Sequence, residues 1–317
     1  ETNPWMAVED FDADHLFRGA SDRMAAHFAD VREAASAAHI YGKRIVAAES
    51  WTGGGFEAPA SMKRIGDYWN THGINRFIFH TSAHQPLDTK PGNRMVGVHI
   101  NRNITWAEQA RPFVDYLSRN SYLLQQGQFA ADIAYYLGED IPAAVPYWEK
   151  IQPAPPEGYD YDFLNTEILQ QLQVSNGRLV LPSGMEYKVL VLPNTQRMSP
   201  AVLNKINALV SQGATVIGPR PVQAQGLTDY PHSDAVVQEL SAAMWGDADG
   251  KMVYEHAWGK GRIIWGAPLN SVLASLKTGP DVQYTRPHLN TRITWIHRRA
   301  GSTDLYFLSN HRRQSEQ

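Results

Sequence analysis

Cysteine is missing from all 317 residues of this sequence. Its absence excludes disulfide bonds, thiolate nucleophiles, and zinc or iron–sulfur centres held by cysteine. It leaves the cellular compartment open, because cytosolic proteins and many exported bacterial proteins both lack cysteine. Any chemistry that the chain performs therefore falls to oxygen and imidazole groups.

Long apolar runs and blocks of like charge are also missing. No run approaches the roughly 18 apolar residues that cross a bilayer, and 29 Lys and Arg nearly balance 32 Asp and Glu, for a net charge of -3. We therefore expect no membrane segment and no nucleic-acid partner. The chain has 43% hydrophobic residues, and at about 150 residues per domain it is long enough for roughly two folded domains.

The chain begins at Glu1 without an initiator methionine or a leader-like segment, and it stops at Gln317 directly after a strand-like run. We interpret both ends as cuts in a longer polypeptide. On this interpretation the chain is a fragment that lacks N- and C-terminal parts of its own protein.

Residues 1–127 alternate between helix and strand patterns. Apolar residues at spacings of three and four predict helices over 21–39 and 60–72, the first of them ended by Gly42. Continuous apolar runs predict buried parallel strands over 44–48 and 74–79. Thr105 and Glu108 have the spacing of a capping box, which predicts a long helix from there to Gly127.

A second α/β unit is predicted over residues 128–286. Ser199 and Pro200 have the pattern of a helix start, and strand patterns lie at 132–137, 187–192, 214–217 and 261–266. This order predicts a doubly wound parallel sheet, with the proline-rich stretch 142–156 as a surface connection. Over residues 287–317, alternation on both sides of a turn-like segment predicts the first hairpin of a third domain, of β type and truncated.

Glu49 directly follows the predicted strand 44–48. Loops converge at the carboxyl ends of parallel strands, and catalytic groups gather there in α/β enzymes. Glu49 is therefore a candidate catalytic carboxylate. The alternative is a surface charge paired with a nearby Arg or Lys.

Four further residues near these strand ends could bind a ligand. His80 and His84 follow the second strand and could donate hydrogen bonds to a polyhydroxylated ligand, although His80 could equally be structural. Their His-x3-His spacing could also hold a metal, but a loop lacks the helical geometry that such pairs use. Trp51 could stack on a sugar ring or fill the core, and Asn101 could bind hydroxyls or build a turn.

Two other chemistries are excluded by pattern. The triple glycine 53–55 is not followed by Gly-Lys-Ser/Thr and is not part of a Gly-x-Gly-x-x-Gly pattern, so no nucleotide site is predicted there. In the second unit no Ser, His and Asp group lies at a nucleophile elbow. We expect that unit to be structural.

Several short segments together carry a specific resemblance. They are AAHIYGK at 37–43, AAESWTG at 47–53, GINRFIFH at 73–80, HQP at 84–86, NRNITW at 101–106, GYDYDFLN at 158–165 and WIHR at 295–298. In these segments, which extend over nearly the whole chain, the sequence resembles the α-L-rhamnosidases of glycoside hydrolase family 106.

The resemblance implies a fold and an activity. It implies that residues 1–127 are the last βα units of a (β/α)8 barrel, that 128–286 form an amidotransferase-like, flavodoxin-like domain, and that 287–317 begin a β-sandwich domain. It implies inverting hydrolysis of α-L-rhamnosyl bonds in an oligosaccharide or glycoside, with Glu49 as the general base.

The resemblance also implies the surroundings of Glu49. His80, His84, Trp51 and Asn101 would line the sugar subsite. Calcium would bind at the sugar site through oxygen ligands that the sequence does not identify. The general acid of the family lies in an Asp-x-x-Glu motif well upstream, so we expect the acid outside this chain and the isolated chain to be inactive.

Two alternatives remain open. In a β-galactosidase-like relative Glu49 would be a nucleophile, and hydrolysis would retain the anomeric configuration. In a non-catalytic carbohydrate-binding or structural module, replacing Glu49 by Gln would change nothing.

Overall fold

The computed structural model describes residues 22–51, 56–80, 82, 99–141, 143, 145–146, 150–311 and 315–316. Two compact units make up the chain. The first contains Glu1–Ala38, Lys43–Phe129 and Tyr284–Gln317, and the second contains His39–Gly42 and Ala130–Gln283. None of the described helices is both long enough and apolar enough to cross a membrane.

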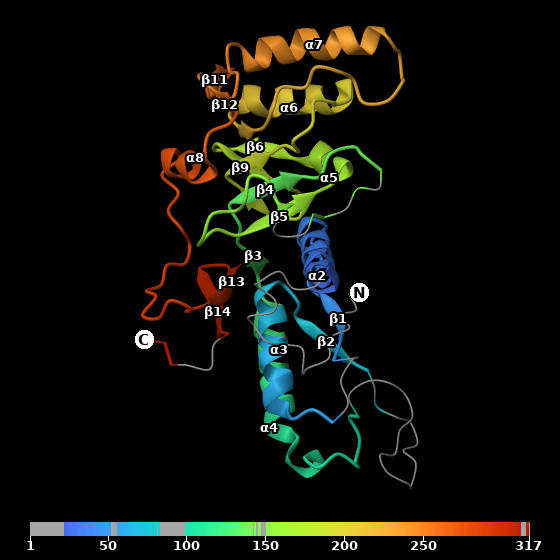
Figure 1. Cartoon of the computed structure of the whole chain (residues 1–317), viewed down its shortest axis with the longest axis vertical. Coiled ribbons are helices and arrows are strands. Elements are labelled where there is room, and N and C mark those ends of the chain that lie inside the picture. The colour runs from blue at the N-terminus through green and yellow to red at the C-terminus, as the bar shows by residue number, and fades with distance from the viewer. Residues whose placement is uncertain are drawn as a thin grey trace. The chain divides into compact units, whose positions relative to one another are not determined.

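The first unit is built on a parallel pair of strands. β1 (Ala47–Ser50) and β2 (Arg76–Phe79) pair in parallel and are connected through α3 (Pro59–Thr71), which confirms the predicted β-α-β step. The unit also contains α2 (Asp22–Ile40), the 3-10 turn η2 (Ala107–Gln109) and α4 (Arg111–Leu124). Figure 1 shows α3 and α4 packed along each other.

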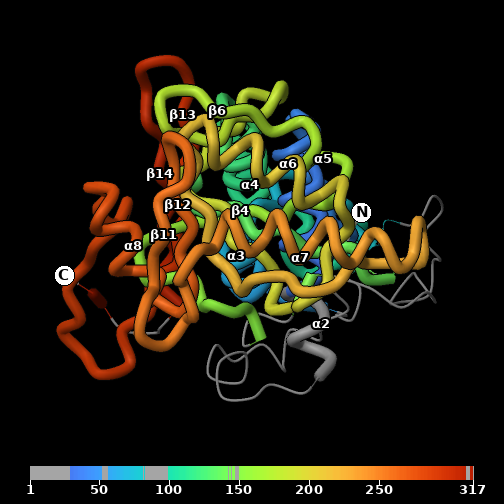
Figure 2. Tube along the Cα trace, turned by 90° about the horizontal axis from the view of Figure 1, so that it is seen from above, coloured from blue at the N-terminus to red at the C-terminus, as the bar shows by residue number. Residues whose placement is uncertain are grey.

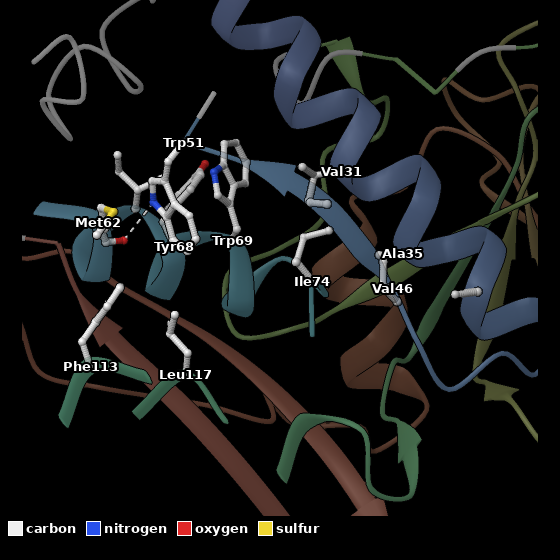
Figure 3. Packing of buried hydrophobic residues seen from close by; sticks show 13 residues of the cluster. Val31, Ala35, Val46, Trp51, Met62, Tyr68, Trp69, Ile74, Phe113 and Leu117 are labelled. Carbon is white, nitrogen blue, oxygen red and sulfur yellow. Dashed lines mark hydrogen bonds between the residues drawn. The ribbon is translucent and has the colours of Figure 1, made fainter. Parts of the chain in front are cut away.

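One apolar cluster holds these elements together. It includes Val31 and Ala35 of α2, Met62 and Trp69 of α3, and Phe113 of α4 (Figure 3). All five side chains are buried. Removing such area from water is the main stabilising term for the unit, at about 25 cal/mol per Å² of apolar surface.

β1 begins three residues later than the predicted strand 44–48. Before Ala47, the side chain of Asn75 replaces a backbone partner, so regular strand pairing has not yet begun. The carboxamide of Asn75 hydrogen-bonds to the backbone of Arg44 and Val46. Regular pairing starts at Ala47, opposite Arg76. Glu49 therefore lies inside β1, as its next-to-last residue, rather than after it.

The predicted capping box is wrong. Neither η2 nor α4 has a side-chain cap, and α4 begins at Arg111 with a proline in its first turn. The indole N–H of Trp106 donates to the carbonyl oxygen of Glu57 at 3.0 Å, which holds this segment in a separate short turn. The fixed backbone of Pro112 then starts the helix six residues after Thr105.

The hairpin at the end of the chain belongs to the first unit. β13 (Ile293–Ala300) and β14 (Thr303–Asn310) are antiparallel as predicted, and β13 also pairs with β3 (Gln128–Phe129). By its contacts the hairpin groups with Lys43–Phe129. The division into three domains stays a prediction. Whether the hairpin begins a β-sandwich stays a prediction.

The second unit contains a largely parallel six-stranded sheet. Its order is β11-β12-β10-β9-β4-β5, with β11 antiparallel at one edge. The strands are β4 (Ile133–Tyr136), β5 (Tyr161–Leu164), β9 (Val189–Val191), β10 (Thr215–Ile217), β11 (Glu255–Trp258) and β12 (Gly261–Ile264). A mixed α/β fold with a parallel sheet is thus confirmed.

Helices and a small antiparallel sheet complete the second unit. α6 (Pro200–Gln212) begins as predicted, with the Ser199 side chain accepting from the N–H of Val202, and it packs against α7 (His232–Trp245) (Figures 1 and 2). The remaining elements are α5 (Thr166–Gln171), α8 (Leu269–Ser275) and the sheet of β6 (Gln173–Ser175), β7 (Arg178–Val180) and β8 (Glu186–Tyr187).

Candidate active site

Glu49 and His80 lie at the same end of the parallel strand pair. In the register of β1 and β2, Glu49 is opposite Ile78 and Ser50 is opposite Phe79. His80 follows β2 directly. The carboxyl ends of both strands therefore bring a carboxylate and an imidazole to one edge of the first unit, as the sequence predicts.

The two faces of β1 differ in burial. Ala48 and Ser50 are fully buried on one face, whereas Glu49 is only partly buried on the other. Side chains of paired residues share a face, and Ile78 opposite Glu49 is 39% exposed. The carboxylate of Glu49 thus lies on the more open face of the strand pair.

Residues 56–57, which come after β1 in the chain, contact residues 99–106, which come after β2. The ring of His99 lies over the ring of Phe56, with centroids 4.5 Å apart, and Phe56 is 63% exposed. The bond from Trp106 to Glu57 joins the same two segments. Residues 99–106 and 56–57 precede α4 and α3, so both segments lie at the carboxyl end of the strand pair. Phe56 is an exposed aromatic ring at that end.

Among the described residues of this region, three polar nitrogens are buried without a hydrogen-bond partner. They are Nδ1 of His80, Nδ1 of His99 and Nδ2 of Asn101. Leaving a buried polar atom unpaired costs about 1–3 kcal/mol, so a polar ligand that satisfied these atoms would gain that energy on binding. His99 was not singled out in the sequence, where it is one histidine in an ordinary alternating run.

Asn101 has a local role in addition. Its Oδ1 accepts a hydrogen bond from the N–H of Asn103 at 2.8 Å, which builds a turn. The sequence left binding and turn formation open for this residue. The structure shows the turn, and the unpaired Nδ2 leaves the binding role as a proposal.

Trp51 fills the core. It is 2% exposed, and its ring lies 4.9 Å from that of Phe77 and 5.0 Å from that of Phe79. Of the two interpretations that the sequence allowed, core filling is the one that the structure shows. The ring offers no open face for stacking on a sugar.

Some expected site features lie outside the described residues or have no support among them. His84 lies outside the described residues. In the parts of the chain that the structure describes, no three His, Asp or Glu side chains form a group suited to a metal ion. Calcium therefore stays a prediction from the resemblance, and no ligand is assigned to it.

One Asp-x-x-Glu spacing does occur before Glu49, at Asp30 and Glu33. Both residues lie within α2 rather than at the end of a strand. Partial burial raises the pKa of Glu33, and the nearby charge of Asp30 raises it further. Their mid-helix position separates them from the strand ends, so we do not assign the general acid to them.

In the second unit, a carboxylate of the protein lies at the edge where ligands bind in open α/β sheets. The chain order places the switch point between β4 and β9. There Oε2 of Glu139 accepts a hydrogen bond from the N–H of Ser199 at 2.7 Å, at the start of α6. A carboxylate at this position stabilises the N-terminus of α6 and would repel an anionic ligand.

The second unit also contains a buried His–Asp pair. Nδ1 of His39 lies 2.9 Å from Oδ1 of Asp162, and the hydroxyl of Tyr187 donates to Oδ2 of Asp162 at 3.0 Å. The side chain of Asp162 has no exposed surface. This closed arrangement gives a substrate no access, which agrees with a structural role.

A carboxylate and buried polar nitrogens at the carboxyl ends of parallel strands form an arrangement that is found in α/β enzymes, hydrolases among them. Comparison with protein families supports this class directly. The sequence model of Glyco_hydro_106, described as alpha-L-rhamnosidase, matches residues 13–317. The chain belongs to glycoside hydrolase family 106.

Two relatives illustrate the similarity. A rhamnosidase structure from Novosphingobium sp. PP1Y matches at a TM-score of 0.76 and 34% identity over 89% of this chain. A curated protein of Formosa agariphila, named as a candidate beta-glucuronidase, is 38% identical over 286 residues, or 89% of this chain. The chain spans 27% of the first relative and 23% of the second, so it corresponds to about a quarter of each.

Proposed function

We propose that the full-length polypeptide carrying this chain hydrolyses terminal α-L-rhamnosyl bonds in glycans or glycosides. One observation carries the proposal within the chain. Glu49 lies on the open face at the carboxyl end of β1, and unpaired nitrogens of His80, His99 and Asn101 are buried in the segments that leave the same strand ends. Membership of the rhamnosidase family supports the choice of sugar.

The proposed chemistry is a single displacement with inversion. Glu49 takes a proton from a water molecule as the water oxygen attacks the anomeric carbon from the face opposite the aglycone. The bond to the leaving oxygen breaks as a carboxylic acid elsewhere in the polypeptide protonates it. The two carboxyl groups would lie about 6.5–9.5 Å apart, which leaves room for the water.

The neighbouring side chains would bind the sugar hydroxyls. We assign His80, His84 and Asn101 to this role, with His99 added because its Nδ1 is buried without a partner. Imidazole and carboxamide groups offer both donors and acceptors, which suits a polyhydroxylated ligand. Trp51 is not included, because its ring is buried in the core.

We propose an architecture for the two units on the same basis. Residues 1–127 would be the last βα units of a (β/α)8 barrel, and the second unit an amidotransferase-like, flavodoxin-like domain. The parallel pairing of β1 and β2 through the α3 connection, with a more buried and a more open face, supports the barrel. In such a barrel, helices cover the outer face and catalytic groups project from the carboxyl ends of the strands.

The test is product analysis with the full-length polypeptide. Aryl α-L-rhamnoside, β-D-galactoside and β-D-glucuronide are offered in parallel, and NMR follows the anomer that is released first. Release of rhamnose with inverted configuration is the expected result. Retention of configuration would favour the β-galactosidase-like mechanism, and release of galactose or glucuronic acid alone would overturn the choice of sugar.

A further inference from the structure

Trp51 adopts a backbone conformation that is rare for a large side chain. Its φ is +63°, in the left-handed region. Among the described residues, the other non-glycine residues with positive φ are Asn176, Asp229 and Lys277. For an L-residue this conformation is sterically unfavourable, and for a bulky side chain it is a true outlier. Other interactions must hold Trp51 in place.

The left-handed turn moves the indole to the face of the sheet opposite Glu49. In an extended strand, residues i and i+2 share a face, so an extended Trp51 would lie beside Glu49. Instead its ring packs on Phe77 and Phe79. Phe77 is opposite Ala48 and Phe79 is opposite Ser50, so the indole lies on the buried face of β1. The conformation of Trp51 thus ends the strand and keeps the indole off the face that carries Glu49.

The indole is fixed on this buried face by polar and apolar contacts. Its Nε1–H donates to the carbonyl oxygen of Met62 in α3 at 3.1 Å (Figure 3). Phe113 of α4 meets the ring edge-on at 6.4 Å. Gly66 of α3 lies so close that a Cβ atom there would be 3.3 Å from Cζ2 of Trp51. Two helices and the neighbouring strand therefore hold the indole in place.

We propose that Trp51 is a positioning residue for Glu49: its left-handed backbone ends β1, and its buried indole anchors the strand end so that the carboxylate keeps its place. The inference rests on the proposed role of Glu49 as the base. Strained backbone held by surrounding structure is characteristic of sites that need one fixed geometry. A misplacement of about 1 Å at a reacting group can lower turnover about 100-fold.

The test compares two buried tryptophans of the same cluster in the full-length polypeptide. Trp51→Phe removes the indole N–H that bonds to Met62. Trp69→Phe is the matched control, because Trp69 is 1% exposed in α3, and its Nε1 has no hydrogen-bond partner. Both variants are assayed well below their melting temperatures. We expect Trp51→Phe to lower kcat at least about tenfold with KM within about twofold, and Trp69→Phe to change neither by more than about twofold.

A double variant separates positioning from general destabilisation. If Trp51 acts through Glu49, adding Trp51→Phe to Glu49→Gln lowers the residual turnover no further. A merely structural role would lower it again by the same factor. Full turnover in Glu49→Gln alone would overturn the proposed function, whereas equal kcat values for Trp51→Phe and Trp69→Phe would overturn only the positioning role.

A second substitution keeps the inference testable if Trp51→Phe does not fold. Gly66→Ala adds a methyl group that meets Trp51 at 3.3 Å and Phe77 at 3.4 Å, and alanine favours a helix more than glycine does. We expect a folded variant with lowered kcat and unchanged KM. A folded Gly66→Ala variant with unchanged kcat would contradict the inference.

Discussion

The side chain of Asn75 takes the place of a strand partner for Val46. Its Oδ1 accepts a hydrogen bond from the N–H of Val46 at 2.9 Å, and its Nδ2 donates to the carbonyl oxygens of Arg44 at 2.8 Å and Leu124 at 3.3 Å. Asn75 is 1% exposed. One carboxamide therefore fixes the entry of the strand that carries Glu49 and ties it to the end of α4.

Replacing Asn75 by Asp tests this role. The substitution keeps the shape and the acceptor but removes both donors and places a carboxylate in a buried site. We expect the free energy of unfolding to fall by about 2–4 kcal/mol. Asn204→Asp, the same change at an exposed position of α6, should alter it by no more than about 0.5 kcal/mol. Equal melting temperatures for the two variants would show that the carboxamide contacts contribute nothing.

Gly127 allows β3 to approach the hairpin. Its φ is +57°, and a Cβ atom there would lie 2.1 Å from the carbonyl oxygen of Arg299. Gly301 has a similar φ of +61° but no heavy atom within 4 Å of its Cβ position. Gly301→Ala should cost about 1 kcal/mol for the left-handed backbone, and Gly127→Ala at least about 2 kcal/mol more for the clash. Urea unfolding measures both, and equal losses would contradict the close packing of β3 against β13.

His72 makes the stability of the first unit depend on pH. Burial lowers its pKa from the ordinary 6.5 to about 3, and the nearby charge of Arg32 acts in the same direction. The unfolded chain takes up this proton near pH 6.5 and the folded chain only near pH 3. Stability therefore falls as pH drops from about 6.5 towards 3, and the histidine contributes no pH dependence above that window.

His72 is partly exposed to solvent, and solvent screening limits the loss of stability that its protonation causes. The slope should stay below about 1.4 kcal/mol per pH unit, which is the limit for one proton. Melting curves between pH 7 and pH 4 should show a smaller loss for His72→Gln than for the original sequence. His288→Gln, at an exposed site, should follow the original sequence. An unchanged pH slope in His72→Gln would contradict a depressed pKa.

Calcium dependence is predicted from the family resemblance alone. Treating the full-length polypeptide with a chelator should lower release of rhamnose from an aryl α-L-rhamnoside. Excess Ca²⁺ should restore it, and excess Mg²⁺ should not, since Mg²⁺ demands a smaller octahedral site. Activity that is indifferent to the chelator, after metal analysis shows that calcium has been removed, would exclude a calcium requirement.

Sequence patterns predicted the elements of the fold better than their boundaries. The helix of Asp22–Ile40 and the Ser199 cap of α6 follow from local patterns. β1 begins late because Asn75, a residue 28 positions after Ala47, supplies the first bonds to its strand. No local pattern contains that information. The hairpin of β6 and β7 was missed although Asn176-Gly177 has positive φ at both positions, as a two-residue type I′ turn requires.

Only part of the candidate site could be predicted, because some of its features also depend on residues that are distant in the sequence. Glu49 and His80 could be placed at one edge because parallel strands bring their carboxyl ends together. The sequence could not decide between sugar stacking and core filling for Trp51, because alternation puts it beside Glu49 and only a left-handed φ moves it to the other face. His99 has no distinctive spacing, and its unpaired Nδ1 is visible only in the folded chain.

The most direct test of the central proposal is turnover by Glu49→Gln in the full-length polypeptide. Glu108→Gln, at an exposed position of η2, serves as the matched control. We predict that Glu49→Gln lowers kcat on an aryl α-L-rhamnoside about 100- to 10,000-fold, the range expected for loss of a general base. Binding of L-rhamnose, measured by calorimetry, should stay within about threefold. Turnover by Glu49→Gln equal to that of Glu108→Gln would contradict the role of Glu49 as the base.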